Sequence, residues 1–107
     1  MSGEDIRRYR RDADLLKALA HPARLCILHG LLREDACRVG RIRECLGLPQ
    51  STVSQHLAVL RAHGIVDGER QGTAVCYRVA DRRVRRLAEA LWGGEDAAEG
   101  KAPPPAK

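Results

Sequence analysis

Aromatic residues are scarce in this chain of 107 residues. Phenylalanine is absent, and besides histidine the only aromatic side chains are Tyr9, Tyr77 and Trp92. Proteins that bind single-stranded nucleic acid stack successive bases on several aromatic side chains. Three scattered rings cannot supply such a series, so the composition argues against a protein that binds single strands.

Long apolar runs are also missing. No segment has the ~20 apolar residues of a membrane-spanning helix, and the first residues, Met-Ser-Gly-Glu-Asp, lack the apolar core of a secretion signal. We therefore expect a cytoplasmic protein with no membrane partner. In that reducing compartment the four cysteines would serve as free thiols or ligands rather than as structural disulfides.

The chain shows no glycine-rich phosphate loop, no Cys/His/Asp constellation and no evident pair of catalytic carboxylates, so we do not expect an enzyme.

Arginine, by contrast, is in excess. Lysine and arginine number 19 against 14 acidic residues, the net charge is +5, and nearly all of the positive charge is arginine. The planar arginine side chain suits phosphate because it can bind two oxygens at once. A basic balance also fits anionic membranes or acidic proteins.

The hydrophobic pattern predicts one domain in which helices precede a hairpin. Apolar residues recur at steps of three and four up to Gly64, and the period then changes to two. Gln71-Gly72 interrupts the alternating stretch as in a β-hairpin, and Asp81 can cap a last helix. The expected elements are helices at 5–20, 22–33, 39–46, 50–63 and 81–91, strands at 65–70 and 73–79, and a polar connection at 34–38.

This order of elements, α-α-α-α-β-β-α, is mainly helical with a small β-hairpin. The predicted domain spans residues 1–92. Residues 93–107 begin with Gly93-Gly94 and are rich in alanine, glutamate and proline. Because such a segment cannot bury a core, we expect it to be a disordered tail.

The helices on either side of Gly47 form a predicted helix-turn-helix. In such units the second helix enters the major groove of DNA and presents its N-terminal residues to base edges. Val53 and Leu57 must face the core, which turns the polar residues around them outward. A glutamine amide can bond to adenine, and serine can bond to several base edges. The predicted base-contacting residues are Gln50, Ser51, Thr52, Ser54, Gln55 and His56.

The hairpin after this helix is the predicted wing, with Arg70, Gln71 and Thr73 near a phosphate or a minor groove. The polar residues at 50–56 could simply solvate the start of a helix, but the wing and the arginine surplus favour double-stranded DNA. Two alternatives stay open. A winged helix that binds proteins would carry apolar residues on the outer face of 50–63. A constitutive DNA-binding protein would have no inducer.

Four stretches of the chain resemble the ArsR/SmtB family of bacterial winged helix-turn-helix repressors. They read LAHPAR at 19–24, LGLPQSTVSQHL at 46–57, LRAHGIV at 60–66 and YRV at 77–79, and the resemblance covers roughly residues 13–91. It implies a homodimer built from the first and last helices, repression at an inverted-repeat operator in DNA, and release by a small inducer. Inducers in the family include thiophilic or transition metals, arsenic and antimony, and reactive sulfur or oxygen species.

The family's best-known sensor sites are not intact here. Arsenic-sensing members carry Cys-Val-Cys where this chain has Arg-Val-Gly at 38–40, and the predicted last helix has no histidine for a zinc or nickel site. The remaining sensor candidates are Cys26, Cys37 and Cys45. Together they could hold an arsenic, antimony, cadmium or zinc ion, and two of them could form a disulfide or polysulfide. The alternative is that each is a small buried hydrophobic residue. Cys76, alone on a predicted strand, is interpreted as structural.

Overall fold

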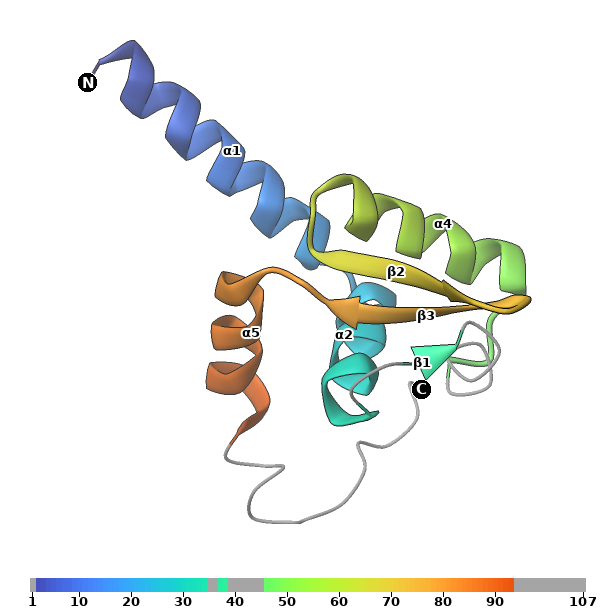
Figure 1. The fold of residues 1–107 in the computed structure, drawn as a ribbon. Coiled ribbons are helices and arrows are strands. Elements are labelled where there is room, and N and C mark those ends of the chain that lie inside the picture. The colour runs from blue at the N-terminus through green and yellow to red at the C-terminus, as the bar shows by residue number, and fades with distance from the viewer. Residues whose placement is uncertain (1, 35–36, 39–45, 94–107) are drawn as a thin grey trace.

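A computed structural model describes residues 2–34, 37–38 and 46–93. Its elements, shown in Figure 1, are α1 (Gly3–Leu19), α2 (Pro22–Glu34), β1 (Cys37–Arg38), α4 (Gln50–Ala62), β2 (Val66–Gln71), β3 (Ala74–Val79), α5 (Arg82–Ala88) and a π-helical turn, η1 (Glu89–Gly93). The fold is mainly helical with an antiparallel hairpin, as predicted. The predicted helix at 39–46 lies outside the described residues except for Leu46, and so does the predicted tail except for Gly93.

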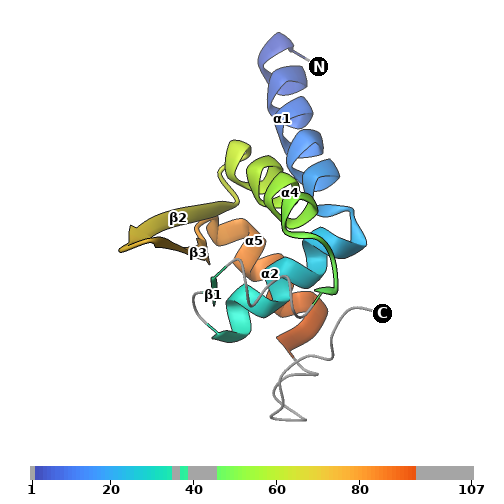
Figure 2. The same cartoon turned by 90° about the vertical axis from the view of Figure 1, so that its right-hand side faces the viewer.

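Helix α1 projects from the body of the protein (Figure 1; Figure 2). Its start is fixed by a capping box: the N–H of Asp5 donates to Ser2 Oγ at 3.2 Å, and the N–H of Ser2 donates to Asp5 Oδ2 at 3.4 Å. At the other end, Leu15, Ala18 and Leu19 are buried. The helix is therefore anchored in the core by its last turns.

The apolar stripe that the sequence predicts along α1 does not face the core. Ile6, Tyr9 and Leu16 are 43, 54 and 53% exposed. Within the described residues no single helix is long and apolar enough to cross a membrane; α1 and α2 would suffice only when joined, and a bend of 86° separates them. The stripe is thus an apolar surface that the described part of the chain leaves exposed.

Helix α2 lies at the centre of the core. Ile27, Leu28 and Leu31 are at most 2% exposed, and the helix contacts α1, α4, α5 and the sheet. Val53 and Leu57 of α4 belong to the same cluster. Full burial of such an aliphatic side chain favours folding by roughly 1.5–3 kcal/mol. The packing of α4 on α2 therefore fixes which face of α4 can reach solvent.

The wing is the antiparallel pair β2–β3, closed by a two-residue loop in which Gly72 has a φ of 65°. This confirms the predicted hairpin and moves its two-residue loop from Gln71-Gly72 to Gly72-Thr73. Gly68 pairs with Tyr77 across the ladder, and a Cβ atom placed on Gly68 would lie 3.0 Å from Tyr77 Cε1. Glycine at position 68 is therefore what allows the Tyr77 ring to lie against strand β2.

The prediction of a polar connection at 34–38 is wrong at its end. Cys37 and Arg38 form β1, which pairs with β3 opposite Tyr77 and Cys76, so β3 is the central strand of three. Two residues are too few to show an alternating pattern, and their partners lie about 40 positions away in sequence. The pairing satisfies backbone groups on an otherwise open edge of β3.

The last helix begins as predicted and ends differently. Asp81 caps α5 by accepting from the N–H groups of Arg83 and Val84 at 2.8 and 3.2 Å. The predicted single helix over 81–91 gives way to the π-helical turn η1, which places the Trp92 ring on the His29 ring of α2 with centroids 4.3 Å apart and planes 12° from parallel. The stack ties the end of the helix to the core helix.

Candidate nucleic-acid interface

Helix α4 has one buried face and one polar face. Val53 and Leu57 are 0 and 2% exposed, whereas the residues on the opposite side are in solvent. Of the predicted base-contacting residues, Thr52 and His56 are half-buried and the exposed ones are Gln50, Ser51, Ser54 and Gln55. The structure therefore gathers four of the six on a single accessible surface at the start of α4.

The N-terminus of α4 has no side-chain cap from its N-cap residue. Its N-cap is Pro49, which has no side chain that can cap the helix. The N–H groups of Thr52 and Val53 both donate to the carbonyl of Pro49 at 3.1 Å, but the first turn contains no acidic residue. Just before it, Gly47 has a φ of 67°, the left-handed conformation expected at the end of the preceding helix. The helix dipole favours an anion at this end.

His56 faces the protein and fixes the orientation of α4. Arg24 Nε–H donates to His56 Nδ1 at 3.3 Å, and a second Arg24 nitrogen donates to the carbonyl of Ala18 at 3.2 Å. The ring of His21 lies 4.6 Å from the ring of His56, and its own Nδ1 accepts from the N–H of Ala23 at 3.1 Å. These contacts join α4 to the corner between α1 and α2.

This histidine–arginine corner is not visible in the sequence pattern. His21 looks like part of a helix break and His56 like a flank of the recognition surface, and Arg24 is 32 positions away from its histidine partner. Charge and burial act together on the site. Burial, and then the nearby His21 and Arg24, lower the pKa of His56 below its usual 6.5.

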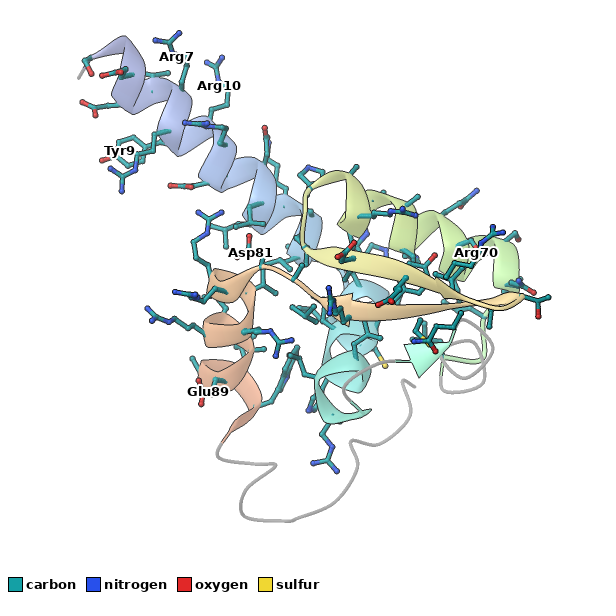
Figure 3. The ribbon with its side chains drawn as sticks, viewed as in Figure 1. Arg7, Tyr9, Arg10, Arg70, Asp81 and Glu89 are labelled. Carbon is teal, nitrogen blue, oxygen red and sulfur yellow. The ribbon has the colours of Figure 1, made fainter. Side chains whose placement is uncertain are left out.

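The predicted wing residues Arg70, Gln71 and Thr73 are all exposed and lie around the tip of the hairpin. Figure 3 shows Arg70 on the outer part of the wing. Gln71 is partly engaged within the protein, since its Oε1 accepts from Cys76 Sγ at 3.3 Å. Cys76, interpreted from sequence as structural, thus orients a wing side chain.

The three predicted sensor thiols are only partly described. Cys26 is half-buried on α2 and packs against the core. Cys45 and the side chain of Cys37 lie outside the described residues. In the part of the chain that is described, no three His, Cys, Asp or Glu side chains are arranged to hold a metal ion.

Known proteins share both the sequence and the fold. A family model described as a helix-turn-helix domain matches residues 19–69. The chain is 42% identical over 86 residues to the transcriptional repressor SmtB of Mycobacterium tuberculosis; the match covers 78% of this chain and 63% of that protein, so less than two thirds of its length. It is 46% identical over 80 residues to the biofilm growth-associated repressor of Agrobacterium fabrum, covering 75% of this chain and 68% of that protein.

Two solved structures are similar throughout. The crystal structure of the repressor PagR of Bacillus anthracis matches with a TM-score of 0.73 and 38% identity, over 80% of this chain and 98% of that one. The homodimeric winged helix-turn-helix domain Mb0332 of Mycobacterium bovis, described as a possible ArsR-family regulator, matches with a TM-score of 0.76 and 30% identity over 94% of both chains. These proteins are named as transcriptional regulators and not as enzymes, in agreement with the expectation from sequence.

The His56 corner predicts that stability falls in mild acid. Because the pKa of His56 is lower in the folded protein than in the unfolded chain, the unfolded chain binds more protons below pH 6.5. The free energy of unfolding should have its full value above that pH. It should decrease as the pH falls toward the pKa of His56 in the folded protein. Urea unfolding between about pH 5 and 8 measures this decline.

His56→Gln is the matched variant, since its amide oxygen can still accept from Arg24 but does not titrate. The decline should be smaller in this variant than in the parent protein. Parallel pH profiles for the two proteins would show that His56 does not contribute.

Proposed function

The chain belongs to the ArsR/SmtB family of winged helix-turn-helix transcriptional regulators, and we propose that it represses transcription by binding an inverted-repeat operator in double-stranded DNA as a homodimer. The observation that carries this proposal is the outer face of α4. Its first two turns expose two glutamines and two serines beside the buried Val53 and Leu57.

The side chains on that face suit the edges of bases. Gln50 and Gln55 each offer a donor and an acceptor on one amide, the pattern that matches adenine in the major groove, and Ser51 and Ser54 can serve several bases. A winged helix that binds proteins would need apolar side chains there. The exposed polar face therefore favours DNA over that alternative. Thr52 and His56 stay as secondary candidates because both are half-buried.

Base contacts and phosphate contacts should respond differently to mutation. Gln50→Ala should weaken binding to a duplex selected from a random DNA library by about 1–3 kcal/mol and relax preference at particular bases. Arg70→Ala should weaken binding to selected and random duplexes alike, and lower the slope of log K against log salt by about 1. Fluorescence anisotropy at several salt concentrations measures both quantities.

Arg82→Ala is the control for Arg70→Ala, because it removes the same charge from an exposed position on α5. This variant should bind the selected and the random duplex with the same affinity as the parent protein. Equal losses on selected and random DNA for Gln50→Ala would contradict its assignment to a base.

A second copy of the chain is the partner that fits the uncovered apolar surface. The exposed residues Ile6, Tyr9 and Leu16 lie on α1, and Leu87 and Leu91 lie at the other end of the chain. Figure 3 shows Tyr9 on the projecting part of α1. An exposed ion pair from Arg83 of α5 to Asp12 of α1 at 3.2 Å lies beside a hollow that Leu16 and Leu87 help to line. Large apolar side chains exposed on two helices are typical of an interface, and the M. bovis domain is homodimeric.

Leu87→Glu should separate the dimer, because it places a carboxylate in the apolar interface. Sedimentation equilibrium at micromolar concentration should give a dimer for the parent and a monomer for the variant. In the dimer the two α4 helices would read half-sites one turn of DNA apart, roughly 34 Å. The variant should therefore bind an inverted repeat no better than a single half-site.

Thr73→Glu is the control for association, since it adds the same charge at the wing tip, away from α1 and α5. It should remain dimeric. A parent protein that is monomeric in the presence of its selected duplex would refute the dimer, and a dimeric Leu87→Glu protein would refute this choice of surface.

For the inducer, we propose a thiol sensor formed by Cys37 and Cys45 with Cys26. The backbone of Cys37 pairs with Tyr77 of the wing, and Cys45 precedes α4 by five residues. Drawing these thiols together would pull on both DNA-contacting elements. A coupling of roughly 1–3 kcal/mol would change operator affinity about 5- to 150-fold. An arsenic, antimony, cadmium or zinc ion would act as a bridge between thiolates. A peroxide would instead take two electrons and two protons from two thiols, joining them as a disulfide and leaving water.

Cys37→Ser and Cys45→Ser should each stay on the operator when arsenite, cadmium, polysulfide or peroxide releases the parent protein. Release by an ion should reverse with a chelating dithiol and leave the denatured protein mass unchanged, whereas oxidation should alter the mass and reverse with any reductant. Cys76→Ser, on the wing but outside the proposed sensor, should respond like the parent. If these agents release both serine variants from the operator as they release the parent protein, the cysteines are packing residues. DNA binding by the protein is then insensitive to these agents.

A further inference from the structure

A hollow lies between the outer face of α4 and strand β3 of the wing, lined by Ser54, Leu57, Ala58, Arg61, Ala62 and Tyr77. We propose that this hollow binds one phosphodiester group of the DNA backbone. The proposal rests on the proposed DNA-binding function and adds a site to it. Arg61 and Tyr77 are not among the residues that the sequence pattern assigns to DNA.

The chemistry of the lining fits a phosphodiester. Three of its side chains, those of Ser54, Arg61 and Tyr77, are hydrogen-bond donors, and no carboxylate lines the hollow. Phosphate oxygens only accept hydrogen bonds, so a set of donors without an acid matches them. The remaining lining is apolar, and two of its residues are alanines, which leave room for a sugar.

Two features prepare this lining for a ligand. The Tyr77 ring packs partly against the core and lies over Gly68, where even a Cβ atom would be only 3.0 Å away, so the ring is held in place. Arg61 is exposed, and among the described residues it has no carboxylate within ion-pairing distance. By comparison, Arg78 on the same strand as Tyr77 is already paired with Asp67 at 3.5 Å.

The position of the hollow also agrees with the geometry of binding. Ser54 lies one turn after Gln50 on the exposed face of α4, and Tyr77 belongs to the wing. If α4 lies in the major groove and the wing reaches the next minor groove, the strand of DNA backbone that separates the two grooves must pass between them. That path crosses the hollow.

The test uses Tyr77→Phe, which removes one hydroxyl and keeps the ring, and Arg61→Gln, which removes one charge from an exposed position. Because phosphates carry no sequence information, each variant should lose affinity equally for the selected and the random duplex. Tyr77→Phe should bind about 3- to 10-fold more weakly with an unchanged salt slope. Arg61→Gln should bind about 10-fold more weakly at low salt and reduce the salt slope by about 0.9.

Ethylation interference locates the contact. Ethylation of at least one backbone phosphate should weaken DNA binding by the parent protein. Ethylation of the same phosphate should not further weaken DNA binding by Tyr77→Phe or Arg61→Gln. The matched control for Arg61→Gln is Arg82→Gln, which makes the same chemical change at an exposed position outside the hollow and should bind both duplexes like the parent. Circular dichroism and urea unfolding establish that each variant is folded.

The outcomes separate the two proposals. A parent protein that binds no duplex would overturn the proposed function itself. A parent that binds DNA no more tightly than Tyr77→Phe and Arg61→Gln would overturn the hollow alone, as would losses confined to the selected duplex. Inorganic phosphate is the other source of the same chemistry. If inorganic phosphate binds the parent more tightly than Arg61→Gln at constant ionic strength while both proteins bind both duplexes equally, the hollow is a site for free phosphate and its assignment to the DNA backbone is overturned.

Discussion

Val53, Leu57 and Leu60 pack almost without solvent contact against the core that α2 organises. A helix repeats every 3.6 residues, so fixing these three positions also fixes the direction of every other side chain on α4. The glutamines and serines of the first two turns are exposed because their neighbours are buried. The corner formed by His21, Arg24 and His56 adds a polar constraint to this apolar one and sets how α4 lies against the end of α1.

The same core is too small to cover all of the chain's apolar surface. Helix α1 enters it only with its last turns, and α5 buries Val84 and Ala88 while Leu87 stays exposed. A domain of about 100 residues buries a modest fraction of its surface. A second copy on these faces would extend the core and at the same time set the distance between two DNA-reading helices. Stability and operator spacing would then depend on one interface.

The central position of β3 links three parts of the protein. It pairs with β2 to form the wing, with β1 to hold the segment after α2, and through Tyr77 it borders α4. Chemistry at Cys37 would therefore act on the strand that carries Tyr77. The proposed sensor and the proposed phosphate site would meet on the same short ladder, which is a physical route from a thiol to the DNA surface.

Local patterns in the sequence determined the four described α-helices, the wing hairpin, the Asp81 cap and the polar outer face of α4, because each depends on residues a few positions apart. The polar connection at 34–38 was wrong where β1 forms, since a two-residue strand has no period of its own and depends on a partner strand far along the chain. The His56 corner, the stack of Trp92 on His29, and the hollow shared by Arg61 and Tyr77 likewise bring together residues that are distant in sequence. No local pattern links such distant residues, because the path of the backbone through the fold sets which of them come into contact. Only the tertiary structure therefore decides these contacts.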